Sequence, residues 1–489
     1  MKRKVLTVLE ITFFSLLITV SGCKKFLNID PPYSQDAENF FTNESDYERA
    51  LIGAYDLLQG TFLSVWISEI ASDNTIAGGE SVTDTEGLHQ IDAMTHGAVN
   101  NELRSIFRWN YAGITRCNFI TENKDKIDFD GKNVIIAQAR FLRAYYYFEL
   151  IKFFGDVPLI IDQRLGVEQV TELPRTPKAD VYAQIESDLS YAVDNLELTT
   201  TTKGKATKGA AQSLLGKAYL YQQKWTEAAQ MFDLVINSGQ YGLFNDFSKL
   251  FFVDNEGCNE TIFDVEYSGL EGGSYGCLIC LEGNAGPGFQ GIRQYNGPVY
   301  GDGNSYNLPT QNLYDAFDAN DLRRDATCLD IDAFIAAQPN AASITYAEGG
   351  GGHTGYYNYK YIKRQAEIGL PDNDLTSPVN YRAIRYADVL LMAAEAYFQS
   401  GNTSLATQYL NNVRTRANMP SINGITINEI YNERRLELSC EGHRFFDLVR
   451  TGQAPNMITN FTTNKNELFP IPLVEIDLAG GNWNQNQGY

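Results

Sequence analysis

The chain has 489 residues, of which 44% are hydrophobic and 12% aromatic, a composition typical of folded protein rather than of disordered segments. This length exceeds what one small core needs and predicts several structural units. Acidic residues number 60 and basic residues 39, so the net charge is −21. An acidic surface repels nucleic acid unless a basic stripe offsets it, and the sequence has no such stripe. DNA and RNA are therefore excluded as partners.

The first 23 residues have the pattern of an export signal. A basic start at residues 2–4 precedes an apolar run at 11–20, which is too short to span a bilayer. The run ends in Val20-Ser-Gly-Cys23, which resembles a bacterial lipobox. We expect residues 1–22 to be removed as a signal peptide and Cys23 to carry the lipid anchor; an ordinary cleavage site beside a free thiol is the alternative. More than one acyl chain on Cys23 would hold the protein at a membrane surface.

Other membrane, disulfide and metal signals are weak. No later stretch approaches 18 apolar residues, so the sequence predicts no membrane-spanning helix. Cys277 and Cys280 form a single CxxC without a second pair, and the four His residues are scattered. We therefore expect no zinc site and no cofactor, while pairing of Cys277 with Cys280 stays open.

Helical periodicity dominates the chain after a leader that ends near residue 45. One helix is expected to start near Asp46, and the segment 138–155 is apolar around most of its circumference, which predicts a central buried helix. The other expected helical segments lie near residues 102–123, 133–154, 179–196, 207–223, 225–238 and 383–452. The sequence therefore predicts a mainly α fold.

Two segments share the spacing of tetratricopeptide helix pairs, in which small residues let two helices approach closely. The matched positions are Gly216, Tyr219, Ala228 and Phe232 in the first segment and Ala394, Tyr397, Ala406 and Leu410 in the second. We predict tetratricopeptide-like pairs at 207–238 and 385–417, with two unrelated helical hairpins as the alternative. Because Gly216 and Ala394 are 178 residues apart, any solenoid is expected to be interrupted.

Residues 261–382 break this pattern and are expected to form an irregular, loop-rich insertion with minor β-structure. A strand is predicted at 261–268, followed by a stretch with eleven Gly between 269 and 303 and by a second Gly- and Tyr-rich stretch at 346–361. Aromatic rings on such loops offer flat apolar surfaces to the C–H face of a sugar, and polar groups can bond its hydroxyls. The expected ligand-binding residues are Tyr275, Phe289, Tyr295 and Tyr300 as stacking rings and Arg293 as a hydrogen-bond donor; packing of these rings on the scaffold is the alternative.

The sequence offers little support for a catalytic site. Gly272-Gly-Ser274-Tyr-Gly276 matches the G-x-S-x-G elbow of serine hydrolases, but that elbow needs a tight strand-to-helix turn, and glycines surround this one on both sides. A secreted hydrolase with Ser274 as its nucleophile therefore stays only as the alternative function. Four acidic residues are expected on a solvated helix face or as helix caps: Asp315, Asp318, Asp321 and Asp325.

Segments spread over nearly the whole chain resemble the SusD/RagB family, the surface glycan-binding lipoproteins of Bacteroidetes nutrient-uptake systems. The segments that carry the resemblance are 23–32, Ser72-Asp73-Asn74, 140–147, 155–158, 385–395, 410–414, 433–438, 441–450, 470–472 and 484–489. It implies an N-terminal helical part at 46–260, the ligand-binding insertion at 261–382 and a C-terminal helical part at 383–489.

The resemblance also implies a function. Members of this family are non-enzymatic lipoproteins of the outer membrane that face the cell exterior. They capture oligosaccharides, or in some cases peptides, and pass them to a SusC-like TonB-dependent transporter, on which they sit as a lid. By the same resemblance, Asp73 and Asn74 are expected to contact the ligand, since relatives often place such contacts in this stretch.

Overall fold

The structure of the protein is a computed structural model that describes residues 39–276, 281–368, 372 and 374–489. The predictions for the signal peptide, for the acylation of Cys23 and for the Cys277–Cys280 pair concern residues outside these ranges. They stay predictions.

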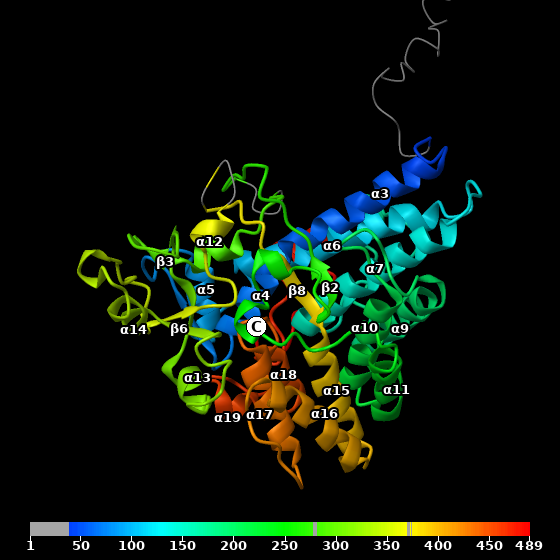
Figure 1. The fold of residues 1–489 in the computed structure, drawn as a ribbon. Helices are drawn as coiled ribbons and strands as arrows, with labels where there is room; N and C mark the ends of the chain where they lie inside the picture. Colours follow the sequence, from blue (N-terminus) through cyan, green and yellow to red (C-terminus); the bar gives the residue numbers. More distant parts are fainter. Residues whose placement is uncertain (1–38, 277–280, 369–371, 373) are drawn as a thin grey trace, which may run out of the picture.

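Helices are the main regular structure of the described chain and far outnumber the few short strands, which confirms the predicted mainly α fold (Figure 1). The α-helices are α3 (Glu44–Asp56), α4 (Thr61–Ile70), α5 (Glu86–Asp92), α6 (Asn101–Glu122), α7 (Lys132–Phe154), α8 (Val167–Val170), α9 (Lys178–Asn195), α10 (Lys208–Tyr221), α11 (Trp225–Ile236), α12 (Gly286–Gln290), α13 (Gln311–Ala316), α14 (Ile331–Ala336), α15 (Tyr386–Gln399), α16 (Thr403–Arg416), α17 (Ile427–Leu438), α18 (Arg444–Arg450), α19 (Ala454–Met457) and α20 (Leu473–Leu478).

Strands are short and pair two by two. They are β1 (Thr75–Gly78), β2 (Thr261–Val265), β3 (Ile292–Arg293), β4 (Asp302–Gly303), β5 (Tyr306–Pro309), β6 (Cys328–Asp330), β7 (Tyr356–Asn358) and β8 (Tyr381–Arg385). β1 pairs with β5, β2 with β8 and β6 with β7, all antiparallel, whereas β3 and β4 are parallel. The insertion between α11 and α15 thus has the minor β-structure that the sequence predicts, and β2–β8 joins its two ends.

The helix α7 is the centre of the N-terminal part. Almost every side chain from Ile135 to Phe154 is buried, in agreement with the apolar pattern around its circumference. The helix ends at Gly155, whose backbone adopts φ = +71°, and the Gly155 N–H still reaches the Ile151 carbonyl at 3.2 Å. Glycine accommodates this backbone without strain, so the chain can turn sharply and begin the return toward α9.

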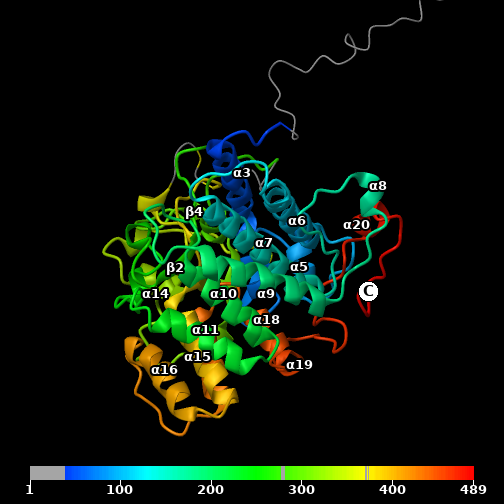
Figure 2. The same ribbon diagram turned by 90° about the vertical axis from the view of Figure 1, so that its right-hand side faces the viewer.

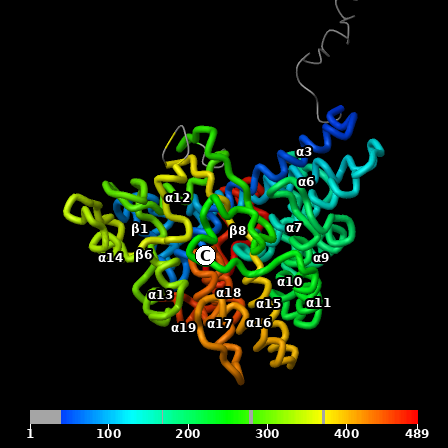
Figure 3. The backbone as a smooth tube through the Cα atoms, in the orientation of Figure 1, coloured from blue at the N-terminus to red at the C-terminus, as the bar shows by residue number. Residues whose placement is uncertain are grey.

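The two tetratricopeptide-like pairs form one continuous stack. α10 packs on α11 and α15 on α16, and α11 packs in turn on α15, so the segments that are far apart in the sequence lie side by side (Figures 1 and 2). The Asp233 carboxylate on α11 accepts hydrogen bonds from the hydroxyls of Tyr397 on α15 and Tyr409 on α16. The solenoid is therefore interrupted in sequence, as predicted, but continuous in space, because the insertion leaves and re-enters between α11 and α15 (Figure 3).

One run of the described chain, Glu44–Ile70, is apolar enough for its length to cross a membrane. It comprises α3, a 3₁₀ turn and α4 rather than one helix, and 56% of its most apolar window is buried inside the fold. Its apolar side chains contribute to the protein core, which accounts for the hydrophobicity of the run. Among the described residues, no group of three or more His, Cys, Asp or Glu could hold a metal ion.

Candidate functional site

Four aromatic rings from distant parts of the chain meet at one edge of the insertion. The ring of Phe289 on α12 lies 5.0 Å from Trp66 on α4, 5.9 Å from Tyr306 on β5 and 6.2 Å from Tyr275, each in an edge-to-face arrangement. The rings of Trp66 and Tyr306 are nearly parallel at 6.4 Å. We call Trp66, Tyr275, Phe289 and Tyr306 the aromatic platform.

Backbone pairing fixes the inner part of the platform. β5 pairs with β1, and Tyr306 lies opposite Gly78 in this pair. The next residue, Gly79, has φ = +85°, and a Cβ at this position would come within 2.5 Å of the Tyr306 ring. Glycine is therefore required under the ring both for its conformation and for the close approach. The Gly349–Gly351 segment lies against the other side of the same loop, where the Gly350 N–H donates to the Glu80 carbonyl at 2.8 Å.

Tyr275 is the ring of the platform that faces solvent most openly. Its side chain is 61% exposed, whereas Phe289 is half-buried and Trp66 and Tyr306 are buried. The Tyr275 hydroxyl lies 3.4 Å from the Asp374 carboxylate. Partial burial and the neighbouring Asp374 raise the pKa of Tyr275, so its hydroxyl remains a hydrogen-bond donor at neutral pH. An exposed ring beside the half-buried Phe289 offers both an apolar face and a polar edge to a ligand.

Carboxylates and an arginine surround the platform on the side of the 78–85 loop. The Tyr306 hydroxyl bonds to the Asp84 carboxylate, and burial together with this bond raises the pKa of Tyr306 well above its ordinary value. Arg293, at the end of β3, donates to Glu80 at 2.8 Å. The hydrogen bond from Arg293 holds the pKa of the Glu80 carboxyl below its ordinary value. Of the predicted site residues, Tyr275 and Phe289 thus belong to the platform, and Arg293 adjoins its Tyr306 side through Glu80 and Asp84.

Tyr295 and Tyr300 lie elsewhere, in the interior of the insertion. They are 7% and 4% exposed and belong to a small separate core with Ile292, Leu329 and Ile362. The Tyr295 hydroxyl donates to the Pro298 carbonyl at 2.9 Å, and the Tyr300 ring packs on Phe334 at 4.9 Å. Their rings pack on the scaffold, which the sequence left open as the alternative, and they present no free face for stacking in this structure.

The side chains of Asp73 and Asn74 also bond to other residues of the protein. Asp73 accepts two hydrogen bonds from Arg444, at 2.7 and 2.9 Å, and forms an ion pair with Arg435 at 3.1 Å. Although burial disfavours its charge, these arginines hold the pKa of Asp73 below its ordinary value. Asn74 is fully buried between Glu69 and Arg435. Both side chains fasten α4 and β1 to the C-terminal helices, and neither has a free polar group directed to solvent.

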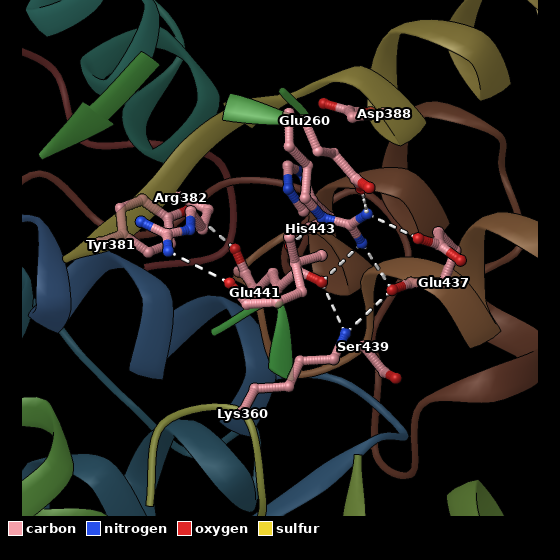
Figure 4. A network of polar contacts seen from close by, with 12 residues as sticks. Glu260, Lys360, Tyr381, Arg382, Asp388, Glu437, Ser439, Glu441 and His443 are labelled. Carbon is pink, nitrogen blue, oxygen red and sulfur yellow. Dashed lines mark hydrogen bonds and ion pairs between the residues drawn. The ribbon is translucent and has the colours of Figure 1, made fainter. Parts of the chain in front are cut away.

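A buried network of charges joins the insertion to the helical scaffold (Figure 4). At the end of β8, Arg385 lies 2.8 Å from Glu260, 2.6 Å from Glu437 and 2.7 Å from Glu441. Lys360 reaches Glu441 at 2.6 Å. Burial opposes the charge of Glu437, but Arg416, Arg385 and Arg323 outweigh it and hold the Glu437 pKa well below its ordinary value.

The same network buries Asp321, which is 5% exposed and forms an ion pair with the buried Arg323 at 2.7 Å, so it does not lie on a solvated helix face. Tertiary packing explains this burial, since Arg323 also contacts Glu433 and Glu437 on α17. Asp318 and Asp321 both act as local caps: Asp318 accepts from the Asn320 N–H at 2.8 Å and Asp321 from the Arg323 N–H at 2.9 Å.

Ser274 lacks the surroundings of a catalytic nucleophile. It lies in an irregular stretch, and its hydroxyl accepts a hydrogen bond from the Gly276 N–H at 3.2 Å. The first helix after it in the described chain, α12, has five residues and begins only at Gly286. A nucleophile elbow needs a strand directly before and a helix directly after the serine, and this arrangement does not occur here.

Two grooves lie beside the 202–205 loop, and no member of the platform lines either of them. Their volumes are about 340 and about 310 Å³, and both are lined by Asp264 and Glu266. Burial raises the pKa of Asp264 to about 6 and that of nearby Glu256 to about 7. Neither groove is lined by an aromatic cluster like the platform, whose exposed and half-buried rings make it the candidate site for stacking on a sugar.

Sequence reasoning did not single out two members of the platform as site residues. Trp66 lies in an apolar helix whose pattern indicates only core packing, and Tyr306 was one of many aromatics on the insertion. Their proximity depends on the pairing of β1 with β5, two strands that are far apart in the sequence. The hydrogen bond between the hydroxyls of Thr85 and Tyr306 joins residues of the same two regions, 221 residues apart. No local sequence signal encodes that pairing.

Comparisons with known proteins agree with this architecture. A model of the SusD family matches residues 339–489, and a second, described as starch-binding and associating with the outer membrane, matches residues 25–220. SusD-like protein P2 of Formosa agariphila is 29% identical over 98% of this chain and 99% of its own length.

Two solved structures extend the comparison. A laminarin-binding SusD-like protein is 32% identical and superposes with a TM-score of 0.84, covering 92% of this chain and 100% of the other. Surface glycan-binding protein A from Bacteroides thetaiotaomicron, solved in complex with laminarihexaose, is 26% identical with a TM-score of 0.82, covering 91% of this chain and all of the other. By sequence and by fold, over nearly its whole length, the chain belongs to the SusD/RagB family.

Proposed function

We propose that this protein is a non-enzymatic, cell-surface binding lipoprotein that captures oligosaccharides. The observation that carries the proposal is the aromatic platform, where exposed Tyr275 and half-buried Phe289 extend from the buried Trp66 and Tyr306. Such a surface can stack on the apolar face of a sugar ring, and the acidic and hydroxyl groups at its edge can bond the sugar hydroxyls. Two relatives of similar fold bind laminarin or laminarihexaose by name, which supports a glycan over a peptide.

Calorimetry tests the binding step. The mature protein should bind at least one neutral oligosaccharide from a panel that includes laminarihexaose, maltoheptaose, cellohexaose and β-1,4-mannohexaose, and chromatography should recover the ligand uncleaved. Ser274→Ala should bind as the wild type does. Cleavage of any ligand that disappears in Ser274→Ala would instead establish the alternative, a secreted serine hydrolase.

We also propose that the protein is held on the outer membrane by lipid on Cys23 and faces the cell exterior. The basic start, the short apolar run and the Val20-Ser-Gly-Cys23 ending support this anchor. Mass spectrometry of protein from its native membrane should find an acylated Cys23 at the mature N-terminus, and Cys23→Ala should release the protein from the membrane. An unmodified Cys23 in that material contradicts the anchor.

A lipid-anchored receptor needs a partner that moves its ligand across the membrane. Family membership supports a SusC-like TonB-dependent transporter in this role. A lid that stays associated while it opens should bury well above about 1,000 Å² against the barrel. Mild detergent extraction followed by affinity purification should recover a large barrel protein with this chain, and repeated recovery of this chain alone would favour a free-standing surface binder.

A further inference from the structure

Carboxylates lie on two sides of the aromatic platform. Glu80 and Asp84 are on the side of Tyr306, and Asp372 and Asp374 are on the side of Tyr275, where both act electrostatically on its hydroxyl. Asp302 lies near Arg293 on the same edge. We call these five carboxylates, Glu80, Asp84, Asp302, Asp372 and Asp374, the acidic rim.

The basic groups at this surface already have partners within the acidic rim. Arg293 donates a hydrogen bond to Glu80 at 2.8 Å and also interacts electrostatically with Asp84 and Asp302. Lys363, whose side chain is 5% exposed, reaches Asp374 at 2.9 Å. A sulfate or carboxylate on a ligand would have to displace one of these carboxylates before it could pair with Arg293 or Lys363.

Two carboxylates of the rim, Glu80 and Asp372, are held in the charged form. The Arg293 hydrogen bond keeps the pKa of Glu80 below its ordinary value. Asp372, which accepts from the backbone N–H groups of Gly273 and Leu375, also has a pKa below its ordinary value, because these hydrogen bonds outweigh its partial burial. These negative charges therefore persist at neutral pH, and the net charge of −21 on the whole chain adds long-range repulsion of the same sign.

We propose that the acidic rim makes the platform selective for uncharged glycans and excludes polyanionic ones, such as polyuronates and sulfated polysaccharides. Stacking on the rings does not distinguish the two classes, because a charged sugar has the same apolar face. The carboxylates do distinguish them: they accept hydrogen bonds from neutral hydroxyls but repel an anionic substituent. Glu80 and Asp374 are the main determinants, since each neutralises a basic group that would otherwise attract the anion.

This inference rests on the proposed function, and a matched pair of ligands tests the two separately. Each neutral oligosaccharide that binds is compared with its C6-oxidised derivative, which has the same backbone and linkages but carries carboxylates. For laminarihexaose or any other bound member of the panel, the oxidised form should bind at least about tenfold more weakly, or ~1.4 kcal/mol. Raising NaCl from about 50 to about 500 mM should reduce the difference in affinity between the neutral and the oxidised ligand, because salt screens exposed charges.

Charge variants supply the second test. Glu80→Gln and Asp374→Asn, alone and together, should shift the affinity ratio toward the oxidised ligand by about fivefold or more, since the positive charges of Arg293 and Lys363 are then no longer neutralised. Glu227→Gln, an exposed carboxylate on α11, should leave the ratio unchanged and controls for net charge. Thermal unfolding of each variant establishes that the fold is intact.

The outcomes are distinct. Equal binding of neutral and oxidised ligands, or a ratio that the Glu80 and Asp374 variants do not move, overturns the inference and leaves the proposed function standing. Binding of the oxidised members alone overturns the inference as well. Binding of no glycan in the panel overturns the proposed function, and the inference with it.

Discussion

Gly216 on α10 lies directly against the ring of Phe232 on α11: a Cβ at Gly216 would come within 2.5 Å of the ring. Both residues are fully buried, so the ring has no free space into which it could move. The absence of a side chain at Gly216 is what allows the two helices of this pair to approach as closely as they do.

Gly216→Leu should therefore destabilise the protein by overpacking, by about 1–3 kcal/mol. Urea unfolding gives this difference as a lower midpoint at unchanged slope. Gly97→Ala is the control, because nothing lies within 4 Å of a Cβ there, and its effect should stay within about 0.5 kcal/mol. A Gly216→Leu protein as stable as the wild type would mean that α10 and α11 separate at no cost.

This contact also shows how far the sequence could predict the fold. The spacing of Gly216 and Phe232 is local, within one helix pair, and it predicts the α10–α11 packing correctly. The contact between α11 and α15 is non-local, and the sequence offers no period that spans the 164 residues between Asp233 and Tyr397. Helix periodicity predicts helices and their buried faces, but it does not predict which distant helices share them.

The candidate site was predictable only in part, for the same reason. Tyr275 and Phe289 are aromatic residues on a Gly-rich insertion, and that pattern indicates a ligand surface. The identical pattern includes Tyr295 and Tyr300, which the fold buries in a second small core. Whether an aromatic loop residue faces solvent depends on the strands and turns that pack behind it, and these are set by long-range contacts.

Arg385→Met should be far more harmful than loss of a surface ion pair. It would leave Glu260, Glu437 and Glu441 buried with part of their countercharge removed, at a cost of about 3–5 kcal/mol. Arg116→Met is the matched control, since Arg116 and Asp56 form an exposed pair at 3.3 Å, and its cost should be below about 1 kcal/mol. Equal midpoints for the two variants in urea unfolding would contradict a stabilising role for the buried network.

The raised pKa of Glu256 predicts that the free energy of unfolding decreases as the pH rises. Burial raises its pKa to about 7 in the folded protein, whereas an unfolded Glu titrates near about 4.3. The folded state thus keeps a proton that the unfolded state releases, so this group favours folding below pH ~4.3, and its contribution declines as the pH rises through ~7.

Glu256→Gln should remove this dependence while keeping the hydrogen bond that the side-chain oxygen accepts from the Asn380 N–H at 2.7 Å. The stability of the variant relative to the wild type should therefore increase between about pH 5 and pH 8. Melting temperatures across this range measure the effect. A constant difference between the two proteins would show that Glu256 titrates normally in the folded state.

Tyr275 supplies the sharpest test of the aromatic platform. Because its side chain is 61% exposed, Tyr275→Ala removes little packing and should change the free energy of unfolding by less than about 0.5 kcal/mol. If the ring stacks on a sugar, the same change should weaken glycan binding by about tenfold, or ~1.4 kcal/mol. Tyr275→Phe should retain most of the affinity, because it keeps the ring and loses only the hydroxyl beside Asp374.

Tyr300→Leu is the contrasting variant, since it removes a 4% exposed ring that packs on Phe334. It should lower the melting temperature and leave the affinity of the folded protein near that of the wild type, the reverse of Tyr275→Ala. Calorimetric titration and thermal unfolding of both variants show which of the two rings contacts the glycan and which only packs in the fold. If Tyr300→Leu abolishes binding in folded protein while Tyr275→Ala binds normally, the glycan lies over the second core of the insertion and the aromatic platform has only a structural role.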